Sequence, residues 1–330
     1  MSRIRARITL TVFTTALSIA AAAASALVRA TIPAAERLVL VNIYNSTHGG
    51  SWTHNTNWCS GTCPLAGTPT FNAVGSECSW YGIGCDANQA HVVAVELAHN
   101  NLVGTLPALG GLTSLQYFSV VANVLTGSIP SLGGLTQLQT FYADSNQLSG
   151  AIPGLSGLTS LGDFSVRHNQ LTGSIPALSG LTNLYSFSAS DNRLGGALPA
   201  LSGLANLRVF DVGENQIGGP LPSLAGSTNL LKLSVKENQM TGAVPAVSGL
   251  PYLYSVNLAF NHLSGALPAA PASLYTPLAF LPSELCPNSF ATTPSGNDAG
   301  WNAATGFAPW WAVPYANNRC DDLFTGGFEP

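Results

Sequence analysis

Residues able to act as acids, bases or nucleophiles are sparse in this chain and match no known catalytic pattern. Charged residues make up only 8% of the 330 residues, and the six histidines are scattered. The sequence has no Gly-x-Ser-x-Gly, His-Glu-x-x-His, Gly-x-Gly-x-x-Gly or P-loop motif, and these are the motifs that hold a nucleophile, a metal or a phosphate. It also has no Cys-x-x-Cys pair that would indicate zinc. We therefore expect no enzyme, no metal site and no cofactor.

Side chains suited to binding a ligand fall into two groups. The first group combines tyrosine with charged residues: Tyr117, Tyr142, Asp144, Asp163, Arg167 and His168. The second group is entirely charged: Asp211, Glu214, Lys232, Lys236 and Glu237. Because Tyr and Arg are favoured anchors in interfaces, the first group is the stronger candidate. The alternative is a solvated face on which Asp144 and Arg167 form a cross-strand pair worth less than about 1 kcal/mol.

An internal repeat of 23 residues positions both groups. Its most regular member is an asparagine, found at Asn100, Asn123, Asn146, Asn169, Asn192, Asn215, Asn238 and Asn261. Gly follows each asparagine by four residues and Pro follows it by seven. A fixed period in the twenties indicates a solenoid, in which each coil packs only on its neighbours.

The segment before each asparagine alternates between apolar and polar residues. In one coil, Phe141 and Ala143 alternate with Thr140, Tyr142 and Asp144, which predicts a short strand with one buried face. The buried position is phenylalanine in five consecutive coils, at Phe118, Phe141, Phe164, Phe187 and Phe210. We expect these rings to stack as a buried aromatic spine about 4.8 Å apart, and not to bind a ligand.

The strands are expected to stack as a parallel sheet, with a turn and an irregular return completing each coil. The asparagine side chains would satisfy backbone groups in the turns and form a ladder. One outward column consists of Glu96, Ser119, Tyr142, Ser165, Ser188, Asp211, Ser234 and Asn257. Eight coils at about 4.8 Å give a face nearly 40 Å long. Solenoids use such faces to bind extended partners.

The start of the chain predicts export. Residues 1–30 combine a basic start, an apolar run and small residues at its end, which is the pattern of a secretory signal peptide. Their removal takes away four of the eleven basic residues, and the remaining seven face fifteen acidic ones, a net charge of −8. No basic stripe remains, so we expect no nucleic acid partner. No other apolar run is long enough to span a bilayer, so we expect no membrane span in the mature chain.

Cysteine and tryptophan are confined to the two ends of the chain. All six cysteines lie outside the repeats, which is consistent with disulfides formed in an oxidising compartment. Six cysteines allow fifteen pairings, of which we predict Cys59–Cys63, Cys78–Cys85 and Cys286–Cys320. The six tryptophans either pack over the terminal coils or, at Trp301, Trp310 and Trp311, stack on sugars.

The repeat resembles the plant-type leucine-rich repeat. The segment LTSLQYFSVVANVLTGSIPSLGG carries the Gly-x-Ile-Pro element, here Gly127–Pro130, that distinguishes this class, and the match covers about residues 88–270. Residues 45–58 and 78–85 are similar to the N-terminal cap of the family, whose two cysteines pair as proposed for Cys78 and Cys85. The resemblance implies a mainly β leucine-rich repeat solenoid, with a parallel sheet on the concave face and an irregular or 3-10 convex side.

Five segments are predicted along the chain. They are a signal peptide (1–30), an N-terminal cap (31–87), a solenoid of eight 23-residue repeats (88–272), a C-terminal cap (273–320) and a tail (321–330). Residues 33–46 begin with Pro and have helix-compatible spacing, so we expect one helix in the N-terminal cap. The tail, DDLFTGGFEP, resembles a short Gly-Phe-Glu ending of some secreted bacterial proteins and favours a bacterial source.

The resemblance implies a recognition function. Similar proteins include polygalacturonase-inhibiting proteins and receptor-kinase ectodomains, which bind proteins, peptides or wall polysaccharides. We predict a secreted recognition protein that binds an extracellular protein or peptide on the concave sheet without catalysis. The alternative is an adhesion or matrix protein that binds cell-wall polysaccharide.

Overall fold

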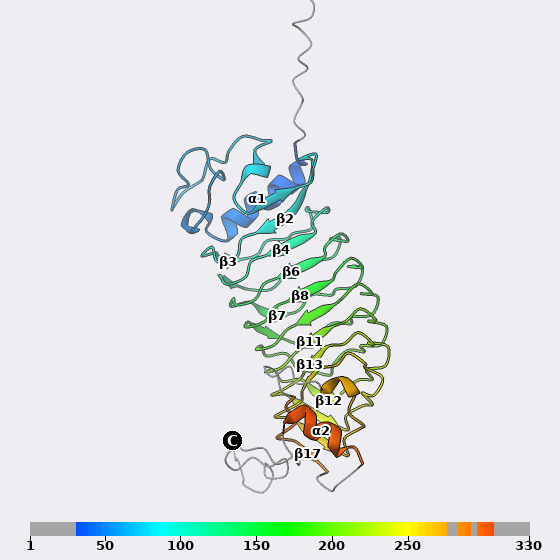
Figure 1. Cartoon of the computed structure of the whole chain (residues 1–330). Helices are drawn as coiled ribbons and strands as arrows, with labels where there is room; N and C mark the ends of the chain where they lie inside the picture. Colours follow the sequence, from blue (N-terminus) through cyan, green and yellow to red (C-terminus); the bar gives the residue numbers. More distant parts are fainter. Residues whose placement is uncertain (1–30, 276–282, 292–295, 307–330) are drawn as a thin grey trace, which may run out of the picture.

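The computed structural model describes residues 31–275, 283–291 and 296–306, and it shows coils stacked along one axis (Figure 1). Within these residues the main sheet has nine strands: β1 (Ile83–Cys85), β2 (Val92–Glu96), β4 (Tyr117–Ser119), β6 (Thr140–Tyr142), β8 (Asp163–Ser165), β10 (Ser186–Ser188), β11 (Val209–Asp211), β13 (Lys232–Ser234) and β15 (Ser255–Asn257). All neighbouring pairs except β1–β2 are parallel. The register joins equivalent residues of successive coils, for example Phe118 with Phe141. The predicted parallel solenoid is confirmed.

The return segments also contain short parallel strands. The strands are β3 (Val103–Thr105) with β5 (Val124–Thr126), β7 (Ser149–Ala151) with β9 (Gln170–Thr172), and β12 (Gly218–Pro220), β14 (Gln239–Gly242), β16 (His262–Gly265) and β17 (Ser289–Phe290) in that order. The sequence predicts an irregular return because the alternation there lasts only about three residues, too few to indicate a strand. The outward positions of these strands form a second, smaller face that mixes polar residues such as Thr126 and Thr172 with apolar ones such as Val103 and Val124.

The predicted aromatic spine fills the centre of the solenoid. All five phenylalanines are fully buried, and successive ring centroids are 5.3, 5.4, 5.5 and 5.7 Å apart with interplanar angles of 10 to 19°. The separations exceed the expected strand spacing of about 4.8 Å and lie within the range of about 4.5–7 Å that is typical of interacting aromatic rings.

The asparagines form the predicted ladder. In a typical coil, the Asn146 amide nitrogen donates to the carbonyl oxygens of Val120, Ala143 and Asp144 at 2.9, 3.3 and 3.1 Å. Its amide oxygen accepts from the Leu125 N–H at 3.0 Å. Each asparagine therefore joins its own coil to the preceding one and satisfies backbone groups that are buried from water.

The residue directly before each ladder asparagine has left-handed backbone geometry. The φ angles lie between 51 and 57° at His99, Ala122, Ser145, His168, Asp191, Glu214, Glu237 and Phe260. None of these eight residues is glycine, so each coil bears the steric cost of an L-residue in this region, about 1–2 kcal/mol. The hydrogen bonds of the adjacent asparagine hold the turn in this conformation.

A ninth asparagine extends the ladder beyond the 23-residue period. The Asn288 amide nitrogen donates to the carbonyl oxygens of Leu258 and Leu285 at 2.8 and 2.6 Å, and its amide oxygen accepts from the Leu263 N–H at 2.9 Å. This last bond spans 25 residues, whereas the equivalent bond to Asn261 spans 21. The change of spacing hides Asn288 from a search for a fixed period.

The N-terminal cap contains the predicted helix, α1 (Ala34–Ser46), together with the short 3-10 turns η1 (Gly49–Ser51) and η2 (Glu77–Ser79). The disulfides Cys59–Cys63 and Cys78–Cys85 are present as predicted. Trp52, Trp58 and Trp80 are buried, with the Trp58 and Trp80 rings 4.7 Å apart. These three tryptophans therefore pack over the first coil, and the packing interpretation is confirmed for them.

Charged side chains attach helix α1 to the rest of the cap and to the first coil. The buried carboxylate of Glu36 accepts from the Val92 N–H at 2.7 Å and lies 2.7 Å from Nδ1 of His91. This hydrogen bond raises the pKa of His91 above its ordinary value. Arg37 forms an ion pair with the buried Glu77. Two adjacent residues of α1 thus attach the helix to two places: Glu36 to the start of β2, and Arg37 to the turn η2.

The C-terminal end contains η3 (Ala272–Tyr275) and helix α2 (Asp298–Thr305). Trp301 is fully buried and its indole N–H donates to the carbonyl oxygen of Pro268 at 2.8 Å, so it packs and is not exposed for sugar stacking. Cys286 is disulfide-bonded. Its expected partner Cys320, the signal peptide 1–30, Trp310, Trp311 and the tail 321–330 lie outside the described residues.

Candidate functional site

The solvent face of the main sheet is more shielded than the alternation predicts. Five residues of one outward column are at least nine-tenths buried: Ser119, Ser165, Ser188, Asp211 and Ser234. These short side chains do point away from the aromatic spine, but longer neighbours such as Tyr142 and Lys232 lie beside them on the sheet. Fewer side chains of this column are therefore accessible to a ligand than its eight outward positions suggest.

The tyrosines of the first group meet an aspartate. The Tyr142 hydroxyl donates to Oδ2 of Asp163 at 2.6 Å, and the rings of Tyr117 and Tyr142 are 6.1 Å apart at 87°. Tyr185, which the sequence interpretation missed, lies near Asp163, whose carboxylate adds to the effect of burial in raising the pKa of Tyr185. At the other end, the carboxylate of Glu96 adds in the same way to the effect of burial on the pKa of Tyr117. We call this set of residues from five successive coils, Glu96–Tyr117–Tyr142–Asp163–Tyr185, the tyrosine strip.

Burial and the neighbouring carboxylates raise the pKa of the three tyrosine hydroxyls of the tyrosine strip. Burial, followed by the hydrogen bond to Asp163, raises the pKa of Tyr142 far above its ordinary value. Burial is also the main cause of the raised pKa of Tyr117 and of Tyr185. All three hydroxyls are therefore neutral hydrogen-bond donors at physiological pH, and the negative charge of the strip stays on its carboxylates.

The predicted cross-strand pair of Asp144 and Arg167 has a different geometry. Oδ1 of Asp144 accepts from the Ser165 hydroxyl and from the backbone N–H of Arg167, each at 2.6 Å. The Arg167 side chain extends to the next coil, where its Nε donates to the Ser190 hydroxyl at 2.8 Å. Burial raises the pKa of Asp144, and these hydrogen bonds oppose the shift. The side-chain pair of the alternative interpretation is therefore not formed, because Asp144 accepts from the backbone N–H of Arg167 while the Arg167 side chain donates to Ser190.

His168 lies at the margin of the sheet, as expected from strand alternation. Its Nδ1 is 2.7 Å from Oδ2 of Asp191 in the next coil, and both side chains are about half exposed. The structure therefore brings Tyr117, Tyr142 and Asp163 together, and places His168 in a separate surface pair.

The second group is a set of ion pairs. Nζ of Lys232 is 3.0 Å from Asp211, and Nζ of Lys236 is 2.7 Å from Glu214 and 3.7 Å from Glu237. The hydrogen bond with Glu214 is the main reason that the pKa of Lys236 is raised. Each cation of this group is therefore compensated within the protein, and a ligand would have to compete for it.

A hollow of about 280 Å³ lies next to the tyrosine strip and is lined by Asn183, Tyr185, Asn206 and Arg208. The two asparagines use their amide nitrogens to bond the carbonyl oxygens of Thr159 and Thr182 at 2.8 Å. Tyr185 is 43% exposed and forms the border between this hollow and the tyrosine strip.

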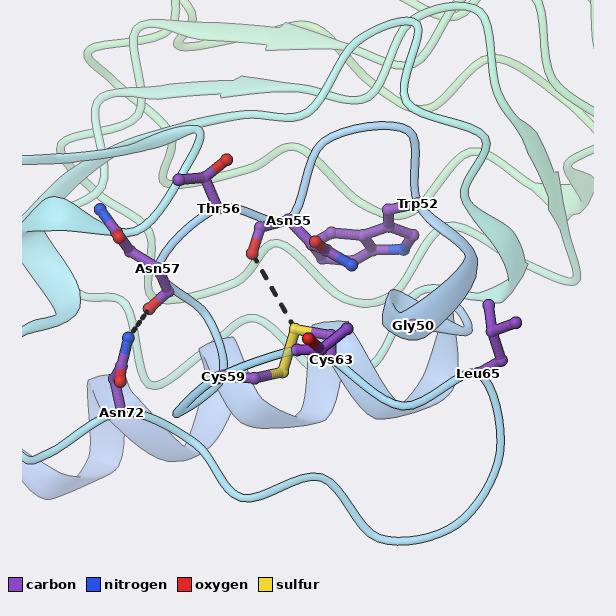
Figure 2. Close-up of a pocket in the computed structure, with 11 residues that line it drawn as sticks. Gly50, Trp52, Asn55, Thr56, Asn57, Cys59, Cys63, Leu65 and Asn72 are labelled. Carbon is purple, nitrogen blue, oxygen red and sulfur yellow. Dashed lines mark hydrogen bonds between the residues drawn. A yellow bond between two sulfur atoms is a disulfide. The ribbon is translucent and has the colours of Figure 1, made fainter.

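A larger hollow of about 690 Å³ lies in the N-terminal cap, beside the Cys59–Cys63 disulfide (Figure 2). Asn55 and Asn57 donate from their amide nitrogens to the carbonyl oxygens of Gly49 and Ser79 at 3.0 and 2.7 Å. Asn72 donates in the same way to Asn57 at 2.7 Å. The nitrogen atoms of the asparagines are thus committed to holding the cap loops together, and the sequence gives no ligand-binding pattern here.

The described part of the chain contains neither a candidate metal site nor a helix that could span a membrane. No group of three or more His, Cys, Asp or Glu residues there is arranged to hold a metal ion. None of its helices combines the length and the apolar character that a bilayer crossing requires.

Comparison with known proteins places the fold among leucine-rich repeat structures. No family model matches the sequence, and no curated protein matches it. The crystal structure of a TDR receptor is 34% identical over 56% of this chain and 33% of the receptor, with a TM-score of 0.52. The leucine-rich repeat ectodomain of the plant membrane receptor kinase GASSHO1/SCHENGEN3 from Arabidopsis thaliana, in complex with CASPARIAN STRIP INTEGRITY FACTOR 2, is 28% identical over 77% of this chain and 30% of that one, with a TM-score of 0.65.

A plant ice-binding protein shares the fold at 23% identity, with a TM-score of 0.55 over 82% of this chain and 91% of that protein. This chain spans about a third of the two receptor structures, 33% and 30%. The stacked coils, the asparagine ladder and the disulfide-bonded cap, together with these similarities, define a leucine-rich repeat solenoid. The predicted fold class is therefore confirmed.

Proposed function

We propose that this protein is an extracellular recognition protein that binds a protein or peptide on the main sheet without catalysis. The observation that carries the proposal is the tyrosine strip, in which partly exposed aromatic rings and carboxylates lie on hydrogen-bonded strands. Rigid aromatic anchors bind partners at low entropic cost, because few torsions are lost on binding. The similar ectodomain of GASSHO1/SCHENGEN3, solved in complex with CASPARIAN STRIP INTEGRITY FACTOR 2, supports a ligand-binding use of the fold.

An extracellular location is part of the proposal. The two cap disulfides support an oxidising compartment, and residues 1–30 would supply the signal peptide. Low charge on the exposed surface is compatible with this location. Similarity to polygalacturonase-inhibiting proteins and a bacterial source stay predictions from the sequence.

Binding to a panel of extracellular proteins and peptides tests the function. The purified, oxidised protein is compared with a Tyr142→Ala/Arg167→Ala variant, and circular dichroism checks that both fold. A matched control is Arg193→Ala, which removes an exposed arginine located just after a ladder asparagine, outside the main sheet. We expect a ligand that binds wild type and the control but loses at least about tenfold in affinity for the double variant, or about 1.4 kcal/mol. Equal binding to all three proteins would refute a site on the main sheet.

A second candidate function is adhesion to cell-wall polysaccharide through the face of the return strands. The third and fifth residues after the ladder asparagines include Thr126, Ser128, Thr172 and Ser174, and none of the sixteen positions carries a charged residue. Binding through such a face should be almost independent of salt, whereas charge-led binding weakens as ions screen it. Co-sedimentation with insoluble wall polymers at low and high salt separates the two functions.

A further inference from the structure

We propose that the tyrosine strip binds basic side chains of an extended peptide, with Asp163 and Glu96 as its two anionic anchors. The inference rests on the proposed function and adds the chemistry of the partner. It follows from the distribution of compensated and uncompensated charge on the main sheet, from the positions of the tyrosine rings, and from the spacing of the two carboxylates.

Carboxylates on the two halves of the main sheet differ in their partners. In the second group, Asp211, Glu214 and Glu237 each lie within 4.0 Å of a lysine nitrogen. In the tyrosine strip, neither Glu96 nor Asp163 has a Lys, Arg or His nitrogen of the described chain within that distance. A hydroxyl that donates to a carboxylate leaves its negative charge in place. The strip therefore carries a negative charge that no cation of the described chain compensates.

The tyrosines add a second contact suited to cations. Tyr142 donates to one oxygen of Asp163, and an ionised carboxylate has about four lone-pair positions, so further acceptor positions remain. An ammonium or guanidinium group that contacts the face of a tyrosine ring gains about 0.5–1 kcal/mol at exposed sites. Tyr185 is the most accessible of the three rings, at 43% exposure.

Gly162 fixes the position of the Tyr185 ring. A side chain at Gly162 would place its Cβ 2.8 Å from Cε1 of Tyr185, so the ring lies over the preceding coil in the space that the glycine leaves. There it is adjacent to Asp163, the next residue after Gly162. A ring held in this position before binding lowers the entropic cost of capturing a ligand.

The spacing of the two carboxylates indicates an extended ligand. Glu96 is on β2 and Asp163 is on β8, three strands away in the order β2–β4–β6–β8. Three strand spacings are about 14 Å, and Asp163 lies two residues before the register partner of Glu96, about 7 Å along the strands, so the two backbone positions are about 16 Å apart. Two residues four positions apart on one face of an extended peptide are about 13 Å apart. The long side chains of two basic residues with this separation cover the remaining distance of about 3 Å and can reach both anchors at once.

The test measures binding of a synthetic extended peptide by isothermal titration calorimetry. One peptide carries two arginines four positions apart among Ser, Thr and Ala, and the other carries citrulline at the same positions, which keeps the shape and removes the charge. The proteins are wild type, Asp163→Asn and Glu96→Gln. Glu237→Gln is the control, because it removes one negative charge from the turn after β13, beside the same sheet but outside the tyrosine strip. Thermal unfolding of each variant checks its fold.

We expect wild type to bind the arginine peptide at least about tenfold more tightly than the citrulline peptide, and each strip variant to lose about fivefold. The control should bind like wild type. Equal affinity for both peptides, or no loss in Asp163→Asn, overturns the proposal. If Asp163→Asn is unfolded, Tyr185→Ala replaces it and should lose affinity for the arginine peptide only.

The result also separates this inference from the proposed function. If the panel of extracellular ligands gives a partner that depends on Tyr142 and Arg167 but binds independently of charge, the proposed function stands and the basic-peptide inference is wrong. If nothing binds the main sheet in either experiment, both are wrong.

Discussion

Replacement of a single ladder asparagine tests the account of how the coils are joined. In Asn169→Ala, the Leu148 N–H loses its acceptor, a bond of 2.9 Å. The carbonyl oxygens of Ala143, Val166 and Arg167 lose one donor each but keep another, from Asn146, Asn192 and the Ser145 N–H respectively. One buried N–H without a partner costs about 1–3 kcal/mol, and the loss of the two amide hydrogens that these three oxygens share adds about 1 kcal/mol for each hydrogen. We therefore expect a loss of about 3–5 kcal/mol in the free energy of unfolding.

The measurement is urea unfolding followed by circular dichroism, with Asn183→Ala as the matched control. The Asn183 side chain is exposed and donates one hydrogen bond, from its amide nitrogen to the carbonyl oxygen of Thr159 at 2.8 Å, so its replacement should cost below about 1 kcal/mol. If Asn169→Ala is no more destabilising than Asn183→Ala, the ladder does not hold the coils together and the reasoning is refuted.

Three further outcomes follow from the fold. Phe164→Ala, which opens a cavity between two stacked rings, should lower the free energy of unfolding by about 3–5 kcal/mol, whereas Phe164→Leu should cost clearly less in the same urea titration. Ala122→Gly should raise the thermal midpoint, because glycine tolerates φ of 54° without the steric cost borne by alanine, about 1–2 kcal/mol; an unchanged or lower midpoint would contradict this. Since the pKa of His91 is raised by Glu36, its contribution is complete below about pH 6.5 and is lost as the pH rises through the folded pKa. The thermal midpoint of wild type should therefore fall over this interval relative to His91→Gln, and parallel pH profiles would exclude the contact.

The repeat made the scaffold readable from sequence. A side chain that recurs every 23 residues must meet its own copies when coils stack, so the packing of Phe141 and the bonding of Asn146 could be inferred without knowing any distant contact. Side-chain contacts can be predicted from the sequence where a residue has the same neighbours in every coil.

The candidate site was harder to predict because its side chains differ from coil to coil, and their exposure and contacts depend on which of them are neighbours on the sheet. Ser165 is outward in the alternation, yet it is buried because longer side chains surround it. Tyr185 belongs to the tyrosine strip only because Gly162, in another coil, leaves space for its ring. The contact of Asp144 with a backbone N–H depends on local geometry that residue types do not reveal.

The asparagine ladder keeps the same hydrogen bonds even where the sequence separation between its members changes. The step to Asn288 takes four more residues than the earlier ones, yet the bonds that it makes are the same. The ladder bonds therefore tolerate extra residues between two asparagines. If a coil were duplicated or deleted, the coils on either side of the change could still form the same ladder hydrogen bonds. Such a change would move Glu96 and Asp163 apart or together by one strand width, about 4.8 Å. The separation of the two anchors can thus change only in whole steps, each of which would favour a ligand with a different spacing of charge.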